Sequence, residues 1–239
     1  MTTTAIDTRL AQQARPDEPV SLIYRLSKLF GRFTFLCTMN THVLHPEIPD
    51  RTGPFILAVT HLSHIEPMCM SVLVRRKIDW MTRKEFYAWR IFDVYLRAMD
   101  TIKVNRQGIA VSAVRTAIER LRMGRVVGIC PEGGVVHGPE AAIRGAPIKR
   151  GVCSAAIRAG VPIIPCVILG THKLNKVGPW LPFKHATIWV TYGQPIQPRA
   201  GVPSTRATRC ALSEELVRAY QELYAELRTT YNIDDSEIP

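Results

Sequence analysis

The sequence has no apolar run long enough to span a bilayer, which takes about 20 consecutive apolar residues. Its first 19 residues, MTTTAIDTRLAQQARPDEP, are polar where a secretory signal peptide needs an apolar core. Both absences argue against a secreted protein and against an integral membrane protein. We therefore expect a cytoplasmic protein in which residues 1–20 form a flexible leader.

Cysteine is sparse, and its six positions show no paired spacing. Most of the six lie in apolar surroundings, as reduced core residues do, and they indicate neither a disulfide framework nor a metal site. The histidines also lack the spacing of metal ligands, so the sequence implies no bound metal. No internal repeat is visible, and 239 residues are enough for one α/β domain with a full core.

Acidic residues are in deficit, with 20 Asp and Glu against 31 Lys and Arg, and the formal net charge is +11. This charge favours an anionic partner, which is nucleic acid, an acidic membrane surface or a phosphorylated substrate. The cations are spread along the chain, and no familiar nucleic-acid-binding motif is present. We therefore expect no nucleic acid partner, although a basic nucleic-acid-binding module remains the alternative class.

Short apolar runs alternate with helical patterns over most of the chain. Six runs are typical of strands: Phe55–Val59, Ile78–Met81, Thr101–Val104, Val126–Cys130, Ile163–Leu169 and Ala186–Tyr192. Apolar residues recur at helical spacing over residues 113–121, 152–159 and 216–227. The alternation predicts an α/β fold with a mixed, mainly parallel central sheet flanked by helices, and we place this domain at residues 46–235.

A basic amphipathic pattern precedes this domain. From Ser21 onward apolar residues recur at helical spacing, and Arg25, Lys28 and Arg32 fall on or beside the other face. We expect an N-terminal amphipathic helical segment over residues 21–45. Such a helix either lies in a membrane interface or packs on its own domain. The first alternative predicts a peripheral protein on the anionic inner face of the cell membrane.

The most informative stretch is THLSHIEP, residues 60–67, which directly follows the first predicted strand. On a continuous helix His61 and Glu66 would lie on different faces, but across a strand-to-helix turn the carboxylate can fold back onto the imidazole. Such a dyad could take a proton from a hydroxyl. The alternative is structural, since Ser63 and Glu66 also form a capping-box pattern with Pro67 at the first helical position.

Two further groups of residues stand at the ends of predicted strands. Pro131-Glu132-Gly133-Gly134 follows a buried strand, and it is either a commonplace turn or a site where backbone N–H groups and a carboxylate meet a ligand. Cations occur in pairs at Lys103 and Arg106 and at Lys149 and Arg150. Each pair is either a solvated surface or a clamp for an anion.

The order of these groups resembles the glycerolipid acyltransferase family, which includes bacterial 1-acyl-glycerol-3-phosphate acyltransferases. The family's first block, N-H-x-S-x-x-D-P, is similar to residues 60–67, and its second is similar to residues 83–86 followed by residues 102–106. The third, F-P-E-G-T-R-S, is similar to residues 130–136, and the fourth, V-P-I-[IV]-P, matches residues 161–165. Four blocks in order are far more specific than any single block.

This sequence departs from the family pattern at two positions. Glu66 stands for the family's Asp, and it is one methylene longer. Val135 stands where the family has an arginine that is associated with the phosphate of the acceptor. Either other cations supply the missing charge or the acceptor carries no phosphate. Besides Arg106, the candidate anion-binding residues are Arg144, Lys149 and Arg150.

The resemblance implies an acyltransferase that moves a fatty acyl group from acyl-CoA or acyl carrier protein to a hydroxyl of a lysophospholipid-like acceptor, with 1-acylglycerol-3-phosphate expected. His61 would be the general base and Glu66 would hold and polarise it. Five residues would bind the acceptor: Lys103, Arg106, Glu132, Gly133 and Gly134. No bound cofactor is implied. The alternatives are an O-acyltransferase for a non-phosphorylated lipid or glycolipid acceptor, and an inactive lipid-binding protein.

Overall fold

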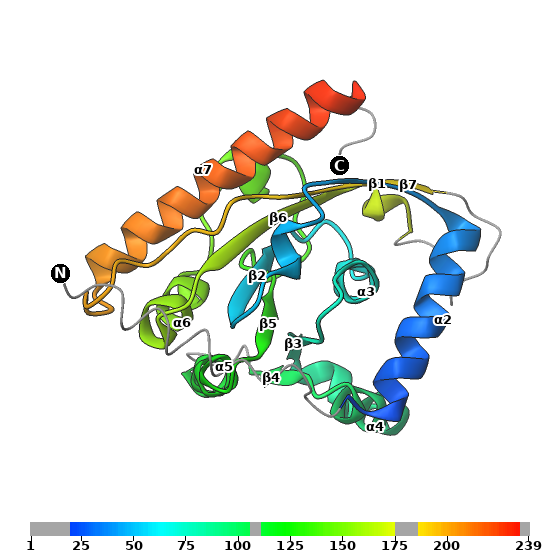
Figure 1. Ribbon diagram of the computed structural model, residues 1–239, viewed down its shortest axis with the longest axis horizontal. Coiled ribbons are helices and arrows are strands. Elements are labelled where there is room, and N and C mark those ends of the chain that lie inside the picture. Colours follow the sequence, from blue (N-terminus) through cyan, green and yellow to red (C-terminus); the bar gives the residue numbers. More distant parts are fainter. Residues whose placement is uncertain (1–19, 106–110, 175–185, 235–239) are drawn as a thin grey trace.

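The computed structural model describes residues 20–105, 111–174 and 186–234, except for the side chains of residues 36–38. Its centre is a seven-stranded sheet with the strand order β1-β7-β6-β2-β5-β3-β4 (Figure 1). The strands are β1 (Met39–Leu44), β2 (Phe55–Val59), β3 (Ile78–Arg83), β4 (Ile102–Val104), β5 (Val126–Ile129), β6 (Ile163–Leu169) and β7 (Ala186–Tyr192).

Five neighbouring strands of the sheet, from β6 to β4, run parallel to one another. β7 is antiparallel to β6, and β1 pairs in parallel with β7, so these two strands run opposite to the other five. The prediction of a mixed, mainly parallel sheet is confirmed. Because the five parallel strands end at one edge, the loops that follow them meet there.

Helices cover both faces of the sheet. The helices are α2 (Leu22–Thr38), α3 (Glu66–Leu73), α4 (Arg90–Ala98), α5 (Val111–Arg122), α6 (Gly151–Ala159) and α7 (Arg206–Tyr231). The short 3-10 turns are η1 (Ile48–Asp50), η2 (Lys84–Ala88), η3 (Gly138–Glu140), η4 (Ala142–Arg144) and η5 (Thr171–Leu174). α5, α6 and α7 pack on one face, and α3 packs on the other with α2 outside it (Figure 1).

The central strands are buried on both sides, which explains why they read as continuous apolar runs. Along β2, Ile56 and Ala58 face the core beneath α5, α6 and α7, whereas Phe55, Leu57 and Val59 face the core beneath α3. All five side chains are fully buried. The strand therefore holds the residues that follow it on a rigid base.

The helix α2 ends at Thr38, and Met39–Leu44 form β1. These six residues belong to the sheet, not to the helical segment that the sequence predicted over 21–45. The strand MNTHVL lies at the edge of the sheet, is only partly buried and pairs with β7, far away in the sequence. Its hydrogen-bond partner is thus invisible to a local pattern. None of the described helices is long and apolar enough to cross a membrane.

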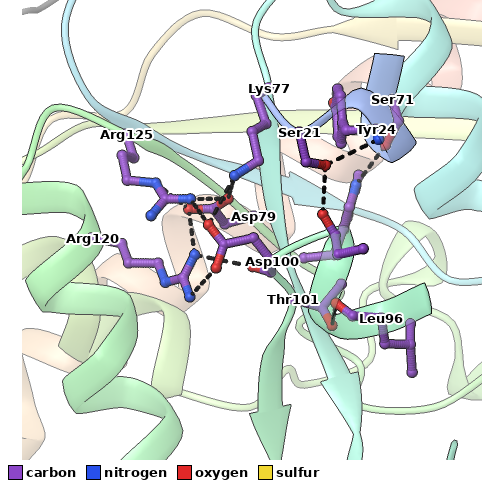
Figure 2. A network of polar contacts seen from close by, with 12 residues as sticks. Ser21, Tyr24, Ser71, Lys77, Asp79, Leu96, Asp100, Thr101, Arg120 and Arg125 are labelled. Atoms are coloured by element: carbon purple, nitrogen blue, oxygen red, sulfur yellow. Dashed lines mark hydrogen bonds and ion pairs between the residues drawn. The ribbon is translucent and has the colours of Figure 1, made fainter. Parts of the chain in front are cut away.

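An ion-pair network joins β3, the end of α4 and the residues around α5 (Figure 2). The buried Asp79 on β3 and the half-exposed Asp100 after α4 share three cations: Lys77, Arg120 and Arg125. Nearby, Ser21 Oγ donates to Ala98 O at 2.8 Å, so the start of α2 is tied to the end of α4. The network fixes the edge of the sheet from which α4 extends.

Candidate active site

The site lies where the three adjacent strands β6, β2 and β5 end. The residues that follow these strands are Thr171 after β6, His61 after β2 and Glu132 after β5. Because neighbouring parallel strands are about 4.8 Å apart, their carboxyl ends bring these residues together from distant parts of the sequence. The fold thus gathers His61, Glu132 and Thr171 at one edge of the sheet.

The imidazole of His61 is bonded to the carboxylate of Glu66. The His61 Nδ1 to Glu66 Oε2 distance is 2.9 Å, and since a carboxylate can only accept, Nδ1–H is the donor. Glu66 is fully buried, whereas the His61 side chain is 16% exposed. The bond leaves Nε2 as the ring nitrogen that can receive a proton. The contact predicted from the spacing is present, and its catalytic role is a proposal developed below.

Ser63 and Glu66 do not form the capping box that was the structural alternative for this stretch. α3 begins at Glu66, and its N-cap residue Ile65 makes no side-chain capping bond. Ser63 Oγ instead accepts from the backbone N–H of Ile65 at 3.1 Å, so Ser63 stabilises the turn between strand and helix. Pro67 does stand in the first turn of α3, as its fixed backbone angle favours.

A second group holds Glu66 from the other side. Thr171 Oγ1 donates to Glu66 Oε1 at 2.6 Å, and both side chains are fully buried. Each oxygen of the carboxylate therefore has a donor. Thr171 was not predicted from the sequence. Its place two residues after the buried run Ile163–Leu169, at the carboxyl end of a strand, is the signal that could have indicated it.

Glu132 ties the loop after β5 to the loop after β2. Its Oε2 accepts from the backbone N–H of His61 at 2.5 Å, and its Oε1 accepts from the N–H of Ala142 at 2.8 Å. Burial raises the pKa of Glu132, and the hydrogen bonds from Ala142 and His61 oppose that rise. In the other direction, Val136 N donates to His61 O at 3.1 Å. In this structure Glu132 positions the backbone that carries His61.

The glycine turn after Glu132 lies beneath a lysine. Gly133 has φ +76°, which favours glycine, and its N–H donates to Cys130 O. A methyl group at the Cβ position of Gly133 would come within 2.7 Å of Lys149 Nζ. The backbone N–H of Lys149 donates to Pro131 O at 2.8 Å, which fixes the lysine beside this turn. The Lys149 ammonium is thus close to the block in which Val135 replaces the family's arginine.

The other predicted anion-binding residues are placed differently. The Arg144 guanidinium lies 5.2 Å from the centre of the Tyr224 ring on α7. Arg150 is the N-cap residue of α6, and Arg106 lies outside the described residues.

The remaining predicted acceptor residue, Lys103, lies on β4, with its ammonium 4.6 Å from the centre of the Tyr87 ring. β5 and β3 stand between β2 and β4, so these strands are roughly 14 Å apart. The structure therefore brings Lys149 to the glycine turn but does not bring Lys103 to the dyad.

His64 borders the dyad on the outside. Its ring centre lies 5.9 Å from that of His61 and 6.4 Å from that of Phe86, both in edge-on geometry. Burial and the nearby His61 lower the pKa of His64, which favours the neutral ring.

Within the described ranges, no three His, Cys, Asp or Glu side chains are grouped so that they could hold a metal ion.

Comparison with known proteins shows the family of the chain. The family model for acyltransferases matches residues 40–169, more than half of the chain. The 1-acyl-sn-glycerol-3-phosphate acyltransferase of Bacillus subtilis (strain 168) is 25% identical over 183 residues, which are 75% of this chain and 85% of that protein.

The fold is also similar to the crystal structure of the 1-acyl-sn-glycerophosphate (LPA) acyltransferase PlsC from Thermotoga maritima. The TM-score is 0.64 and the identity 24%, over 84% of this chain and 80% of that chain. At this identity the likeness shows a common fold. His61, Glu66 and Glu132 all lie within the residues that the family model matches.

Proposed function

The chain belongs to the glycerolipid acyltransferase family, and from this premise we propose that it transfers a fatty acyl group from a thioester donor to a hydroxyl of a lysophospholipid. The observation that carries the proposal is the 2.9 Å bond between His61 Nδ1 and the buried Glu66, within the matched residues. The similar B. subtilis protein is named for 1-acyl-sn-glycerol-3-phosphate, which is therefore the first acceptor to test.

In the proposed reaction His61 is the general base. Its Nε2 takes the proton of the acceptor hydroxyl as the oxygen attacks the carbonyl carbon of the thioester. The C–S bond then breaks, and the departing thiolate receives the proton from the imidazolium. Glu66 accepts the Nδ1–H bond throughout, which fixes the ring and stabilises its charged form. The step requires neither a covalent intermediate on the protein nor a bound cofactor.

The acceptor's phosphate has one candidate partner at the glycine turn. Lys149 lies over Gly133, where it can supply the charge that Val135 does not. A second acceptor class is favoured by that same replacement of arginine by Val135, since an acceptor without a phosphate needs no cation there.

The donor is acyl-CoA or acyl carrier protein, and both are anionic thioesters that suit a basic chain.

We further propose that the protein attaches peripherally to the anionic inner face of the cell membrane. Large apolar side chains are exposed on α2, and others are exposed on the neighbouring η2 and α4 and at Trp89 between them. These side chains are Leu22, Leu26, Leu29, Phe30, Phe33, Phe86, Trp89, Ile91, Phe92 and Val94. Together with the net charge of +11, these two apolar surfaces suit an interface with anionic lipid.

The test is acyl transfer to 1-acylglycerol-3-phosphate and to its dephosphorylated counterpart, with acyl-CoA and with acyl carrier protein as donors. Lys149→Met should lower kcat/KM for the phosphorylated acceptor by about 10- to 100-fold, since a charge-assisted bond is worth roughly 1.5–3 kcal/mol. It should leave the dephosphorylated acceptor unaffected. Arg144→Met is the matched control, because that guanidinium lies against Tyr224.

Each contrary result has a definite meaning. Equal use of both acceptors by the wild type would favour the second acceptor class. A strong preference for the phosphorylated acceptor that survives Lys149→Met would place the phosphate elsewhere. Thioester cleavage with water alone would make the protein a thioesterase, and absence of any cleavage would leave an inactive lipid-binding or nucleic-acid-binding protein.

A further inference from the structure

A cavity of about 650 Å³ lies between α2, the start of β1 and the end of α3. Its volume is within the range of about 300–1,000 Å³ that is typical of small-molecule sites. Glu66 begins α3, whereas the cavity is lined by residues at the end of that helix, Val72 and Leu73. At 1.5 Å per residue this places the cavity roughly 10 Å along α3 from the dyad. It is a different site.

The cavity combines cations with an apolar wall. Three basic residues line it, Lys28, Arg32 and Arg75, and none of the described lining residues carries a carboxylate. The remaining lining residues are apolar except for Thr41, and they are Phe35, Met39, Thr41, Val72 and Leu73. This composition matches a ligand with a negatively charged head and an apolar chain.

Among the described residues, one of these three cations, Arg75, is paired with a carboxylate. Lys28 Nζ donates to the carbonyl oxygens of Val74 at 2.6 Å and Arg75 at 3.0 Å, at the end of α3. Arg75 is 3.3 Å from Asp50, but its side chain is 86% exposed. Arg32 has no ion-pair partner among the described residues. Burial, and then repulsion from Arg32, lower the pKa of Lys28, and a bound anion would relieve that repulsion.

The helix α2 directs one face to this cavity and another to solvent. Tyr24 is buried, and Gly31 packs so closely on Val72 that a Cβ would come within 2.8 Å of its methyl group. The opposite face carries the exposed residues Leu22, Leu26, Leu29, Phe30 and Phe33. If that face enters a membrane interface, the cavity lies at the depth of lipid headgroups.

We propose that this cavity binds an anionic phospholipid of the membrane, with its phosphate among Lys28, Arg32 and Arg75 and the start of a chain against Phe35 and Leu73. The inference rests on the membrane attachment proposed above and not on the transfer reaction. The bound lipid would hold α2 and α3 together and would favour anionic membranes over neutral ones of equal apolar content.

The test measures binding to the full chain by calorimetric titration, with dihexanoyl phosphatidylglycerol, dihexanoyl phosphatidylcholine and inorganic phosphate as probes. We expect saturable binding of the phosphatidylglycerol and much weaker binding of the other two. Removing cations in Arg32→Gln/Arg75→Gln should weaken binding by about fivefold for each charge. Thr41→Trp fills the cavity and keeps every cation, and it should abolish binding of the phosphatidylglycerol. Arg206→Gln, at the start of α7 on the other face of the sheet, removes the same charge and should change nothing.

Three outcomes would overturn the inference. The first is equal affinity for the two phospholipids, or phosphatidylglycerol binding that the arginine substitutions leave unchanged. The second is inorganic phosphate binding as tightly as the lipid, which would make the cavity an ion site. The third is a Thr41→Trp variant that binds phosphatidylglycerol normally, which would place the bound lipid outside the cavity. Because binding is measured without turnover, an inactive protein would leave the inference standing.

Discussion

At the scale of single residues, the proposed reaction depends on the ring nitrogen of His61 that Glu66 leaves open. His61→Ala removes the base and should lower kcat by about 10²- to 10⁴-fold. The fold should persist, since the side chain is partly exposed and its backbone N–H bond to Glu132 remains. Initial rates of thioester cleavage with acceptor present, together with circular dichroism, check both parts. Near-normal turnover by a folded variant would exclude His61 as the base.

The hydroxyl of Thr171 is the second residue-scale feature with a measurable role. Thr171→Val leaves Glu66 Oε1 buried without its donor, which should cost about 1–3 kcal/mol of unfolding free energy. It should also lower kcat more than it raises KM, because Thr171 touches the carboxylate and not the substrate.

Thr171→Ser is the matched control, because it retains the hydroxyl and should restore both stability and kcat. If the valine variant were as active and as stable as the serine variant, Thr171 would have no positioning role.

At the scale of elements, the ion-pair network predicts a dependence of stability on pH (Figure 2). Burial alone would raise the pKa of Asp100, but hydrogen bonds from Arg120, Arg125 and Lys77 outweigh it and hold that pKa well below its usual range. A carboxyl whose pKa is lowered on folding stabilises the native state above its unfolded pKa, roughly 3.9. This stabilisation is lost as the pH falls from there through the folded pKa.

Asp100→Asn removes this contribution, and asparagine suits the left-handed backbone at this position, where φ is +59°. Above about pH 5 the variant should be less stable by about 1–2 kcal/mol, a figure reduced for the screening of a half-exposed carboxyl. The difference should shrink as the pH falls toward 3. Denaturant unfolding at several pH values measures it, and a difference that does not change with pH would contradict the role of the network.

At the scale of the whole molecule, two sources of the proposed membrane attachment can be separated. The net charge of +11 should contribute electrostatic binding to the membrane, which salt weakens. The apolar face of α2 should contribute hydrophobic binding, which salt does not weaken. Leu29→Gln/Phe33→Gln replaces two side chains that are 65% and 66% exposed, so the fold should be unaffected.

Sedimentation with vesicles of phosphatidylcholine and phosphatidylglycerol in high salt should show the variant's binding reduced by at least tenfold, since each inserted side chain contributes about 1.5–3 kcal/mol. Met123→Gln is the control, because this 69% exposed residue follows α5 on the other side of the sheet. Equal loss in both variants would remove α2 from the account of attachment.

The sequence by itself determined the central strands and the pairing of His61 with Glu66. A strand buried on both faces reads as an unbroken apolar run, so Phe55–Val59 and Ile163–Leu169 could be predicted with their observed bounds. The pair of His61 and Glu66 could be predicted because five positions and one strand-to-helix turn separate the two residues. The strands and this pair are local features, set by residues close together in the chain.

Only the tertiary structure decided which residues support that pair and which cation lies at the glycine turn. Thr171 is 105 positions from Glu66, and Glu132 is 71 from His61, and each contact exists because neighbouring strands end at the same edge. Packing between distant parts of the chain also brings Lys149 over Gly133, turns Arg144 toward Tyr224 and pairs β1 with β7. Periodicity reports which face of an element is buried, but strand order decides which elements become neighbours, and that order depends on contacts across the whole chain.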